Sequence, residues 1–315
     1  MTRTVLRIGT RASALALWQA RHVQALIGAL PDAPVLELVP ITTAGDVQTQ
    51  VPLWTVGGRA FFTRELDHAL LEERIDLAVH SLKDLPTELE TGLALTAVLA
   101  REDPCDALVS RAGGALTTLP AGARIGTSSV RRRAFIARLR PDIQLHELRG
   151  NVPTRLALLE RGDYDAIVLA AAGLKRLGLE ARITERLSPV QFPPAVSQGA
   201  IGVCARSNDR VTARWLDPLD HAATRLAATA ERALLQRIEG GCQVPLGALA
   251  HLTGGLLHLR AVVCSLDGTR SLSAEGSAPA AGARELGERL AENLLAQGAA
   301  QLIAAQRAAQ QVSVP

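Results

Sequence analysis

The stretch RIGTRAS, from Arg7 to Ser13, decides the fold, because it returns later in the chain as RIGTSSV, from Arg124 to Val130. Each copy is typical of a β-strand that ends in Gly-Thr and leads to a serine at a helix start. A looser echo pairs RIDLAVHSLKD with DYDAIVLAAAGLKR, again a strand followed by a turn. The two echoes predict two lobes of similar build rather than an array of repeats.

The rest of the chain fits around these lobes. Strands that alternate with helices predict α/β lobes with largely parallel sheets, whose ligands bind at the carboxyl ends of the strands. The segment FPPAVSQGAIGVCAR is expected to return the chain to the first lobe. We predict three domains: residues 1–99 with 200–217, residues 105–193, and residues 222–315.

The third domain begins with a long helical pattern over 222–238, and the loop around Cys242 follows it. Strand-like runs come next, separated by turns at Gly254-Gly255 and Asp267-Gly268. A C-terminal Ala-rich helix is expected to close the chain.

Composition limits the class of protein. The chain has 315 residues, of which 48% are hydrophobic, and these values suit two or three packed domains. No apolar run is long enough to span a bilayer, and the first residues lack the features of a signal peptide, so a cytoplasmic protein is expected. The four cysteines are widely spread and never form C-x-x-C, so we expect neither a disulfide framework nor a metal site.

The charge is unevenly distributed. Residues 105–193 hold fourteen Arg and Lys against eight Asp and Glu, a balance of +6, although the whole chain carries only +3. This basic middle third favours an anionic partner. Because Lys83 and Lys175 are the only lysines, the Arg count can reflect genome composition, and the placement of the arginines is better evidence. Eight aromatic residues make stacking on single-stranded nucleic acid a poor fit, and no nucleic-acid partner is expected.

The stretch GTSSVRRR places basic residues where a helix does not need them. Ser128 or Ser129 caps the helix, and Arg131 and Arg132 lie in its first turn, where they oppose the helix dipole. Together with the free backbone N–H groups they predict a cradle for a carboxylate or phosphate. The alternative is a solvated basic helix face.

The stretch ELRGNVPTR repeats this logic. Asn151 caps a helix that Pro153 begins, and Arg149 and Arg155 flank the turn. Alone, this pattern is better read as two surface arginines near a cap. Beside the arginines of GTSSVRRR, it predicts several convergent arginines and therefore a polyanionic ligand.

Two further stretches follow strands or glycines in the first lobe. DLAVHSLKDLP is a buried-strand pattern that ends in Lys83 and Asp84, an acid beside a base, although a simple turn is the alternative. We interpret His80 as a satisfied structural histidine. In VGGRAFFTRELD, Arg59 and Phe62 follow a flexible Gly-Gly pair and could form a lid, or merely lead into a helix.

Cys242 lies in EGGCQVPLG, after two glycines and just beyond a helical pattern. A buried structural cysteine would lie in an apolar run, and a zinc ligand would have a Cys or His partner at fixed spacing. Neither is present, so these two explanations do not account for this thiol.

Six stretches together resemble one family. RIGTRASALALWQA, DLAVHSLKDLP, GTSSVRRR, LRGNVPTRL, LAAAGLKRLGL and IEGGCQVP are similar, in this order and over nearly the whole chain, to porphobilinogen deaminase, also called hydroxymethylbilane synthase. The resemblance implies a transferase of tetrapyrrole biosynthesis that condenses four porphobilinogen molecules into hydroxymethylbilane and releases ammonia. It also implies three α/β domains: two lobes like those of periplasmic binding proteins, and a smaller third domain that carries the cysteine loop.

The resemblance also implies roles for particular residues. A dipyrromethane cofactor, made from two porphobilinogen units, would be joined by a thioether to Cys242, and Asp84 would be the catalytic carboxylate. Cofactor binding would fall to Lys83, Ser129, Arg131 and Arg132. Substrate binding would fall to Arg11, Ser13, Arg149, Arg155, Arg176, Arg59 and Phe62. The expected partner is porphobilinogen, without nucleic acid or membrane, and a monomer is expected.

The chain departs from the family pattern at four positions. Arg59 stands for a frequent Lys, Pro153 and Ser197 stand for Gly, and Cys204 stands for an acidic residue. Ser197 puts the local backbone geometry in doubt rather than the activity.

Two rival interpretations stay open at this point. One is a two-lobed binding protein for a small anion, without catalysis. The other is a basic nucleic-acid-binding protein, which would show steeply salt-dependent binding.

Overall fold

The computed structural model describes residues 5–43, 63–238 and 244–312. These residues fall into two compact units. The first holds 5–43, 63–102 and 199–225, and the second holds 103–198, 226–238 and 244–312. The three domain boundaries expected from the sequence stay a prediction.

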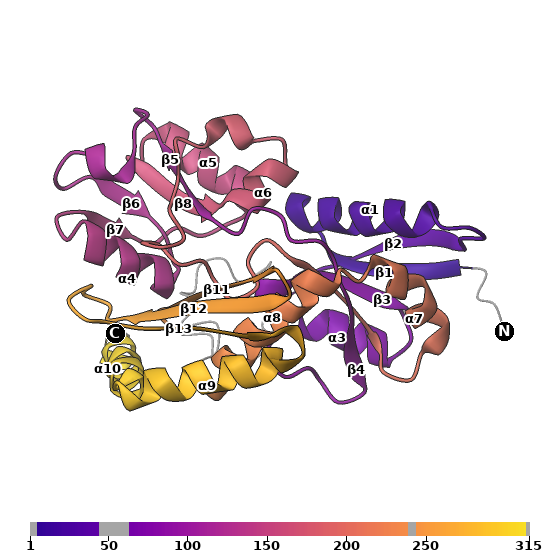
Figure 1. The fold of residues 1–315 in the computed structure, drawn as a ribbon. Helices are drawn as coiled ribbons and strands as arrows, with labels where there is room; N and C mark the ends of the chain where they lie inside the picture. The colour runs from indigo at the N-terminus through magenta and orange to yellow at the C-terminus, as the bar shows by residue number, and fades with distance from the viewer. Residues whose placement is uncertain (1–4, 44–62, 239–243, 313–315) are drawn as a thin grey trace. The chain divides into compact units, whose positions relative to one another are not determined.

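Unit 1 is built on one mixed sheet (Figure 1). Its strands are β1 (Val5–Arg11), β2 (Val35–Ile41), β3 (Leu77–Ser81), β4 (Leu93–Val98) and β10 (Ile201–Arg206). They lie in the order β2-β1-β3-β10-β4, with β1 parallel to β2 and β3, and β10 antiparallel to β3 and β4. The chain therefore returns to the first lobe through β10, as the sequence predicts.

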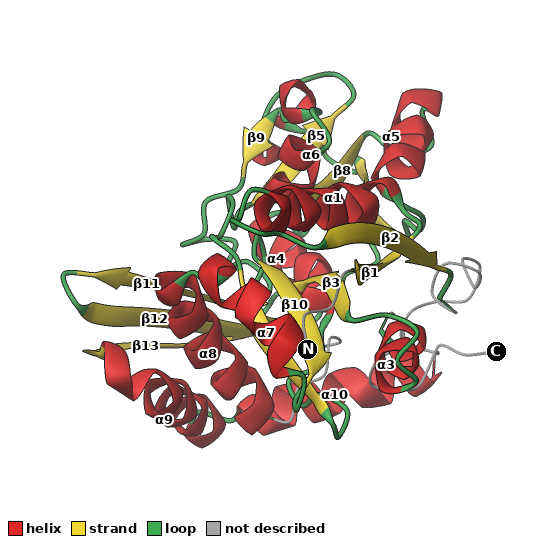
Figure 2. Ribbon diagram, turned by 90° about the vertical axis from the view of Figure 1, so that its right-hand side faces the viewer, coloured by secondary structure: helices red, strands yellow, loops and turns green. Residues whose placement is uncertain are grey.

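Helices cover both faces of this sheet. Helix α1 (Ala14–Gly28) packs Ala20, Val23 and Ile27 on Leu6 and Ile8 of β1, and α7 (Arg210–Leu216) joins the same core. Figure 2 shows α1 lying along β1 and β2. Helix α3 (Arg64–Leu71) buries Leu66, Ala69 and Leu70 in unit 1 as well. Side chains alternate between the faces of a strand, so strands covered on both sides, such as β3 and β10, are buried along nearly their whole length.

The first sheet of unit 2 repeats this plan. Its strands are β5 (Asp106–Ser110), β6 (Arg124–Gly126), β7 (Gln144–His146), β8 (Ala166–Ala170) and β9 (Glu185–Arg186), in the order β7-β6-β8-β5-β9. Again the first three run parallel, and β5 is antiparallel to both of its neighbours. The predicted pair of similar lobes is confirmed, with β6 equivalent to β1 and β8 equivalent to β3.

The helices of this lobe also lie on both faces of the sheet. They are α4 (Val130–Leu139), α5 (Val152–Arg161) and α6 (Ala171–Arg176). One core packs α4 against the sheet, and a second core packs α5 and α6 against it. Asn151 caps α5 by accepting from the N–H of Thr154 at 2.9 Å, and Pro153 lies in its first turn, where a proline is tolerated.

The echoed RIGT motif places the same ion pair in each lobe. In the first, Asp76 accepts from the backbone N–H of Arg7 at 2.8 Å and from its guanidinium at 3.0 and 3.1 Å. In the second, Asp165 accepts from the backbone N–H of Arg124 at 2.8 Å and from its guanidinium at 3.3 and 3.4 Å. In each lobe, the arginine that begins the motif thus binds the aspartate just before the neighbouring parallel strand.

The glycine of the motif has an equally local reason. A Cβ on Gly9 would lie 2.2 Å from Cδ1 of Ile75, and a Cβ on Gly126 would lie 2.9 Å from Cδ1 of Tyr164. Ile75 and Tyr164 each precede the aspartate of the repeated ion pair. In both lobes, therefore, close packing against the next strand requires glycine at this position.

The third sheet, also in unit 2, is antiparallel and has the order β11-β12-β13. Its strands are β11 (Leu246–Thr253), β12 (Leu256–Cys264) and β13 (Ser271–Pro279), and its helices are α8 (Ala222–Arg237), α9 (Ala283–Ala296) and α10 (Ala299–Val312). Figure 1 shows α9 running along this sheet. The Gly254-Gly255 turn has positive φ at both residues, as a tight hairpin requires. The Ala-rich C-terminal helix expected from the sequence is present as α10, and the chain turns at Gly298, where φ is +102°, to separate it from α9.

Ser197 has a backbone conformation that glycine adopts more readily than serine. Its φ is +63°, a left-handed conformation that costs a non-glycine residue about 1 kcal/mol. The strain is held in place because the Ser197 N–H donates to Glu231 at 2.6 Å, and the same carboxylate accepts from Ala250 N–H at 2.7 Å. Both Ser197 and Glu231 are fully buried.

Candidate functional site

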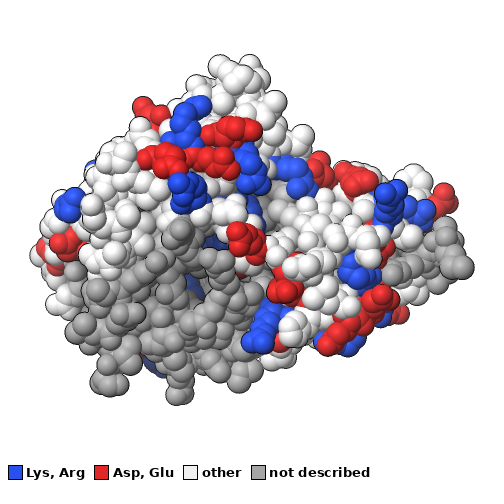
Figure 3. Space-filling model, turned by 90° about the horizontal axis from the view of Figure 1, so that it is seen from below, with Lys and Arg blue, Asp and Glu red and all other residues white. Residues whose placement is uncertain are grey.

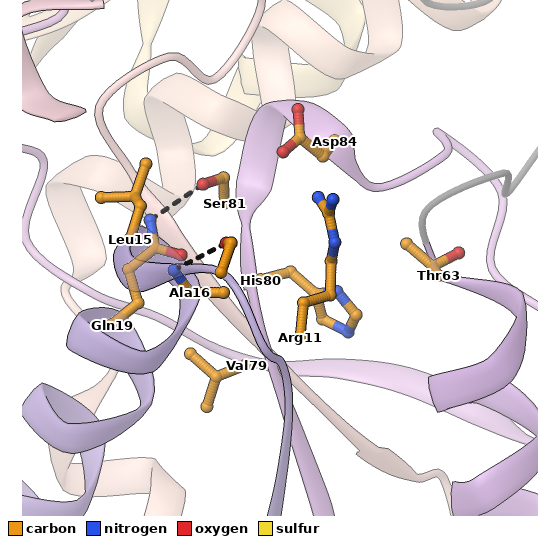
Figure 4. Close-up of a pocket in the computed structure, with 10 residues that line it drawn as sticks. Arg11, Leu15, Ala16, Gln19, Thr63, Val79, His80, Ser81 and Asp84 are labelled. Carbon is orange, nitrogen blue, oxygen red and sulfur yellow. Dashed lines mark hydrogen bonds between the residues drawn. The ribbon is translucent and has the colours of Figure 1, made fainter. Parts of the chain in front are cut away.

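A pocket opens in unit 1 at the carboxyl ends of β1 and β3, where ligands of such sheets bind. Its open space is about 410 Å³. Its lining combines one cation, one carboxylate, an imidazole, three hydroxyls and an amide with apolar groups, from Arg11, Ser13, Leu15, Ala16, Gln19, Thr63, Val79, His80, Ser81 and Asp84. Figure 4 shows the Arg11 side chain extending from beside His80 toward the Asp84 carboxylate.

The local structure explains why these side chains meet. Arg11 is the last residue of β1, and Ser13 caps α1 by accepting from the Ala16 N–H at 3.3 Å. Strand β3 ends at Ser81 and turns directly into the 3₁₀ helix η1 (Leu82–Asp84). This tight turn buries Leu82 and leaves Lys83 and Asp84 half-buried at the strand end. Arg11, Ser13 and Asp84, which the sequence singles out as candidate site residues, thus line one cavity.

His80 is buried in this pocket, and only 5% of its surface is exposed. Its Nε2 has no hydrogen-bond partner among the described residues, so the interpretation as a satisfied structural histidine does not hold for this atom. Burial, with the positive charge of Arg11 as a second cause, lowers the pKa of His80 to about 4. The imidazole is therefore neutral near pH 7 and keeps one polar atom for a ligand or water.

This lowered pKa predicts a pH-dependent stability. Between pH 6.5 and about 4 the unfolded chain binds a proton that folded His80 does not, so the free energy of unfolding falls as the pH falls through this window. From pH 7 to pH 5, wild type should lose about 2 kcal/mol more than the His80→Asn variant. Urea unfolding at both pH values measures this difference. Equal losses in the two proteins would contradict it.

Two polar pocket residues, Gln19 and Thr63, were missed by sequence reasoning. Gln19 is buried on α1 and donates to the Ser81 hydroxyl at 2.8 Å, a contact drawn in Figure 4. Thr63 is fully buried and donates to Asp67 at 2.9 Å. The sequence did contain a signal for Gln19, because it is a polar residue on the inner face of an amphipathic helix. For Thr63 we find none, because its place depends on the packing of α3.

The second lobe holds Ser129, Arg131 and Arg132 at the start of α4. Ser129 caps the helix and accepts from the Arg132 N–H at 3.4 Å. Arg131 and Arg132 are only 5% and 6% exposed, so the alternative of a solvated basic helix face is wrong. Burial lowers the pKa of Arg132, and the nearby Asp106 charge opposes that effect.

Both guanidinium groups converge on Asp106, which is fully buried at the first position of β5. Arg131 Nη1 lies 2.6 Å from one carboxylate oxygen, and Arg132 Nε and Nη2 lie 2.9 and 2.7 Å from the other. Gln198 also donates to Asp106, at 3.2 Å. Removing one partner of such a buried ion pair costs about 3–5 kcal/mol. In the sequence Asp106 comes directly before an apolar run, but the sequence does not indicate which residues pair with it.

The remaining predicted arginines of this lobe lie at helix ends. Arg149 is half-buried before α5, and burial lowers its pKa, with Glu147 acting against this. Arg155 donates through Nε to the Gly150 carbonyl at 2.8 Å. Arg176 is the last residue of α6 and is half-buried. Arg149, Arg155 and Arg176 thus lie at α5 and α6, whereas Ser129, Arg131 and Arg132 lie together at the start of α4.

Three predicted site residues, Cys242, Arg59 and Phe62, lie outside the described residues. The other three cysteines are free thiols. Cys204 and Cys264 are fully buried, and Cys204 lies in β10, between β3 and β4. Burial, followed by the charge of Asp103, raises the pKa of the half-buried Cys105 to about 11. None of these three is suited to act as a thiolate at neutral pH.

Within the described ranges, no cluster of three or more His, Cys, Asp or Glu side chains could hold a metal ion. None of the helices in that part of the chain has the length and apolar content needed to cross a membrane.

Two family models match the chain. The model described as porphobilinogen deaminase, dipyromethane cofactor binding domain, matches residues 6–214. The model described as porphobilinogen deaminase, C-terminal domain, matches residues 225–296. Together they cover both lobes and most of the third sheet with its helices.

Several solved structures are similar at low identity. A nutrient binding protein from Burkholderia cenocepacia bound to methionine has a TM-score of 0.44 and 14% identity, over 67% of this chain and 89% of that chain. A lipoprotein of the YaeC family from Enterococcus faecalis V583 has a TM-score of 0.41 and 10% identity, over 69% and 91%. A Salmonella typhimurium periplasmic binding protein with high arginine specificity has a TM-score of 0.39 and 13% identity, over 69% and 92%.

Proposed function

We propose how the residues of this chain perform the reaction of the porphobilinogen deaminase family, to which the chain belongs. The chain is a transferase of tetrapyrrole biosynthesis, a hydroxymethylbilane synthase that acts on porphobilinogen and carries a dipyrromethane cofactor. It condenses four porphobilinogen molecules head to tail into hydroxymethylbilane and releases ammonia. The family match does not favour the alternative of an anion-binding protein without catalysis.

The residues present fit this cofactor and substrate. Every pyrrole unit carries an acetate and a propionate, which suit arginine and lysine side chains, and a pyrrole N–H, which suits a carboxylate. The pocket of unit 1 offers both kinds of group in Arg11 and Asp84, and a buried imidazole nitrogen of His80 without a partner among the described residues. This juxtaposition of cation and carboxylate at the strand ends is the observation that carries the proposal.

We assign Asp84 as the catalytic residue. Its carboxylate accepts hydrogen bonds from pyrrole N–H groups and stabilises the positive charge that develops on the incoming porphobilinogen as ammonia leaves. Arg11, Ser13 and Lys83 hold carboxylates on the same side of the first lobe. When bound, the dipyrromethane supplies the pyrrole carbon to which new units are joined.

Cys242 is the residue proposed to hold the cofactor through a thioether. The support comes from the other cysteines: Cys105 has a raised pKa, and Cys204 and Cys264 are buried. In the second lobe, we assign the contacts with pyrrole carboxylates to Ser129, Arg131, Arg132, Arg149, Arg155 and Arg176. Arg59 and Phe62 complete the proposed substrate-binding set.

The arginines give a direct test of this assignment. Arg131→Leu and Arg132→Leu should yield less stable but folded protein that lacks most of its cofactor. Arg131→Leu removes a charge-assisted contact worth about 1.5–3 kcal/mol, and Arg132→Leu releases the Asp106 carboxylate that Arg132 binds. Intact mass of the purified protein measures the fraction that carries the adduct. Arg133→Leu is the matched control, because Arg133 lies on the same helix and pairs at 3.5 Å with the half-exposed Glu147. Full loading of the Arg131 and Arg132 variants would reduce these arginines to a structural role.

We also propose that the chain acts as a cytoplasmic monomer without a nucleic-acid partner. The described cysteines are free thiols, which suits a reducing compartment. On the face shown in Figure 3, Lys and Arg atoms lie beside Asp and Glu atoms rather than in one large basic patch. Such mixed charge suits a solvated surface better than a phosphate backbone.

A further inference from the structure

Asp106 lies at the ligand end of the second lobe. It pairs with Ala170, the last residue of β8, whereas in the first lobe the equivalent pair joins Ile201 to Ser81. Ser81 follows Asp76 by five residues, and Ala170 follows Asp165 by five, so the two positions correspond. The second lobe thus has a buried acid where the first lobe has isoleucine. The fold itself does not need an acid at this position.

The contacts of the two arginines with Asp106 are unequal. Arg132 uses all three guanidinium nitrogens inside the lobe: Nε and Nη2 bind Asp106, and Nη1 donates to the Val168 carbonyl at 2.8 Å. Arg131 uses Nη1 alone, for Asp106 at 2.6 Å and for the Pro193 carbonyl at 2.7 Å. The Arg131 guanidinium also lies over the Phe192 ring, with Cζ 5.8 Å from the ring centroid, but within the described part of the chain no hydrogen bond or ion pair uses its Nε or Nη2.

The charges of this trio do not balance. Two guanidinium groups face one carboxylate, so Arg131, Arg132 and Asp106 together carry one surplus positive charge in a buried place. A buried surplus charge is costly unless another group of opposite sign compensates it. An incoming carboxylate would do so, and the unused edge of Arg131 has the paired N–H donors that a carboxylate needs.

We propose that Asp106 is the positioning residue of the second-lobe anion site. It holds Arg131 by Nη1 so that the Nε and Nη2 edge faces the carboxylate of the pyrrole ligand, while Arg132 anchors Asp106 to β8. This inference rests on the proposed function, in which Arg131 holds a cofactor carboxylate. Asp106 acts through Arg131 and does not itself touch the ligand.

The test uses full-length protein expressed without cofactor and then loaded with porphobilinogen. The rate at which the adduct mass appears is measured against the porphobilinogen concentration, and the melting temperature is measured in parallel. Asp106→Glu keeps the charge but moves it by one methylene, and Asp106→Asn removes the charge. Both variants should need at least about tenfold more porphobilinogen for half-maximal loading, because a displaced guanidinium loses its bidentate geometry.

Asp165→Asn is the matched control. It breaks an aspartate–arginine pair beside the start of β8, away from the ligand end, so it should lower the melting temperature yet load at the wild-type concentration. If the Asp106→Asn protein fails to fold, the loading of the Asp106→Glu protein tests the inference instead. A folded Asp106→Glu protein that loads at the wild-type concentration, beside a deficient Arg131→Leu protein, overturns this inference alone. Normal loading of Arg131→Leu overturns the proposed role of Arg131 and this inference with it.

Discussion

Ammonia release by the Asp84→Asn variant should be slower than that of wild type by at least about a hundredfold, the low end of what a positioned acid–base group contributes. The amide keeps the size and part of the hydrogen bonding of the carboxylate, but it cannot stabilise a developing positive charge. Asp84 is half-buried at the end of η1, on the wall of the pocket that Arg11 also lines. The substitution should therefore change the chemistry without disturbing a core.

Single-turnover ammonia release is the measurement, with circular dichroism to confirm folding. Asp84→Glu keeps the charge and shifts it by one methylene, so we expect a smaller but still substantial loss. Glu90→Gln is a matched control, because Glu90 is an exposed acid on the same segment and does not line the pocket. Near-normal ammonia release from a well-folded Asp84→Asn protein would mean that the catalytic acid lies elsewhere.

The Cys242→Ser variant should carry no covalent adduct and should form no hydroxymethylbilane. A serine hydroxyl stays protonated at neutral pH and is a much weaker nucleophile than a thiolate, so the tether cannot form. Intact mass measures the loss of the adduct, and digestion of the wild-type protein should place the modification on the peptide that contains Cys242.

Cys105→Ser is the matched control for this experiment. Cys105 is half-buried, and burial together with Asp103 raises its pKa to about 11, so its removal should leave both the adduct and turnover intact. An unmodified Cys242 peptide in active enzyme would refute the assignment. So would an adduct on Cys105, Cys204 or Cys264.

The buried trio of the second lobe connects these predictions to the fold. Asp106 lies at the start of β5, the first strand after the chain leaves unit 1. Gln198, which donates to it, lies one residue before the chain returns to unit 1. The contact between Asp106 and Gln198 therefore joins the segment where the chain enters the second lobe to the segment where it leaves. We expect substitutions at either end to affect cofactor loading as well as stability.

The sequence by itself determined the plan of the two lobes. The echo of RIGT predicted equivalent strands, and the structure gives both lobes the same strand order and directions. Ser13, Asn151 and either Ser128 or Ser129 were expected to cap helices, and the side chains of Ser13, Ser129 and Asn151 accept from the first turns of their helices. These features depend on residues within a few positions of one another, so local chemistry is enough to predict them.

Only the tertiary structure decided which groups are compensated and which are left for a ligand. Arg131 meets an acid 25 residues away, and Gln198 meets the same acid across 92 residues. Burial leaves His80 neutral with one polar atom unpaired among the described residues, and a contact with Glu231 holds Ser197 at positive φ. Each outcome depends on desolvation and on partners that are distant in the chain. A sequence pattern identifies charged residues, but their charge balance is set only when the strands bring them together.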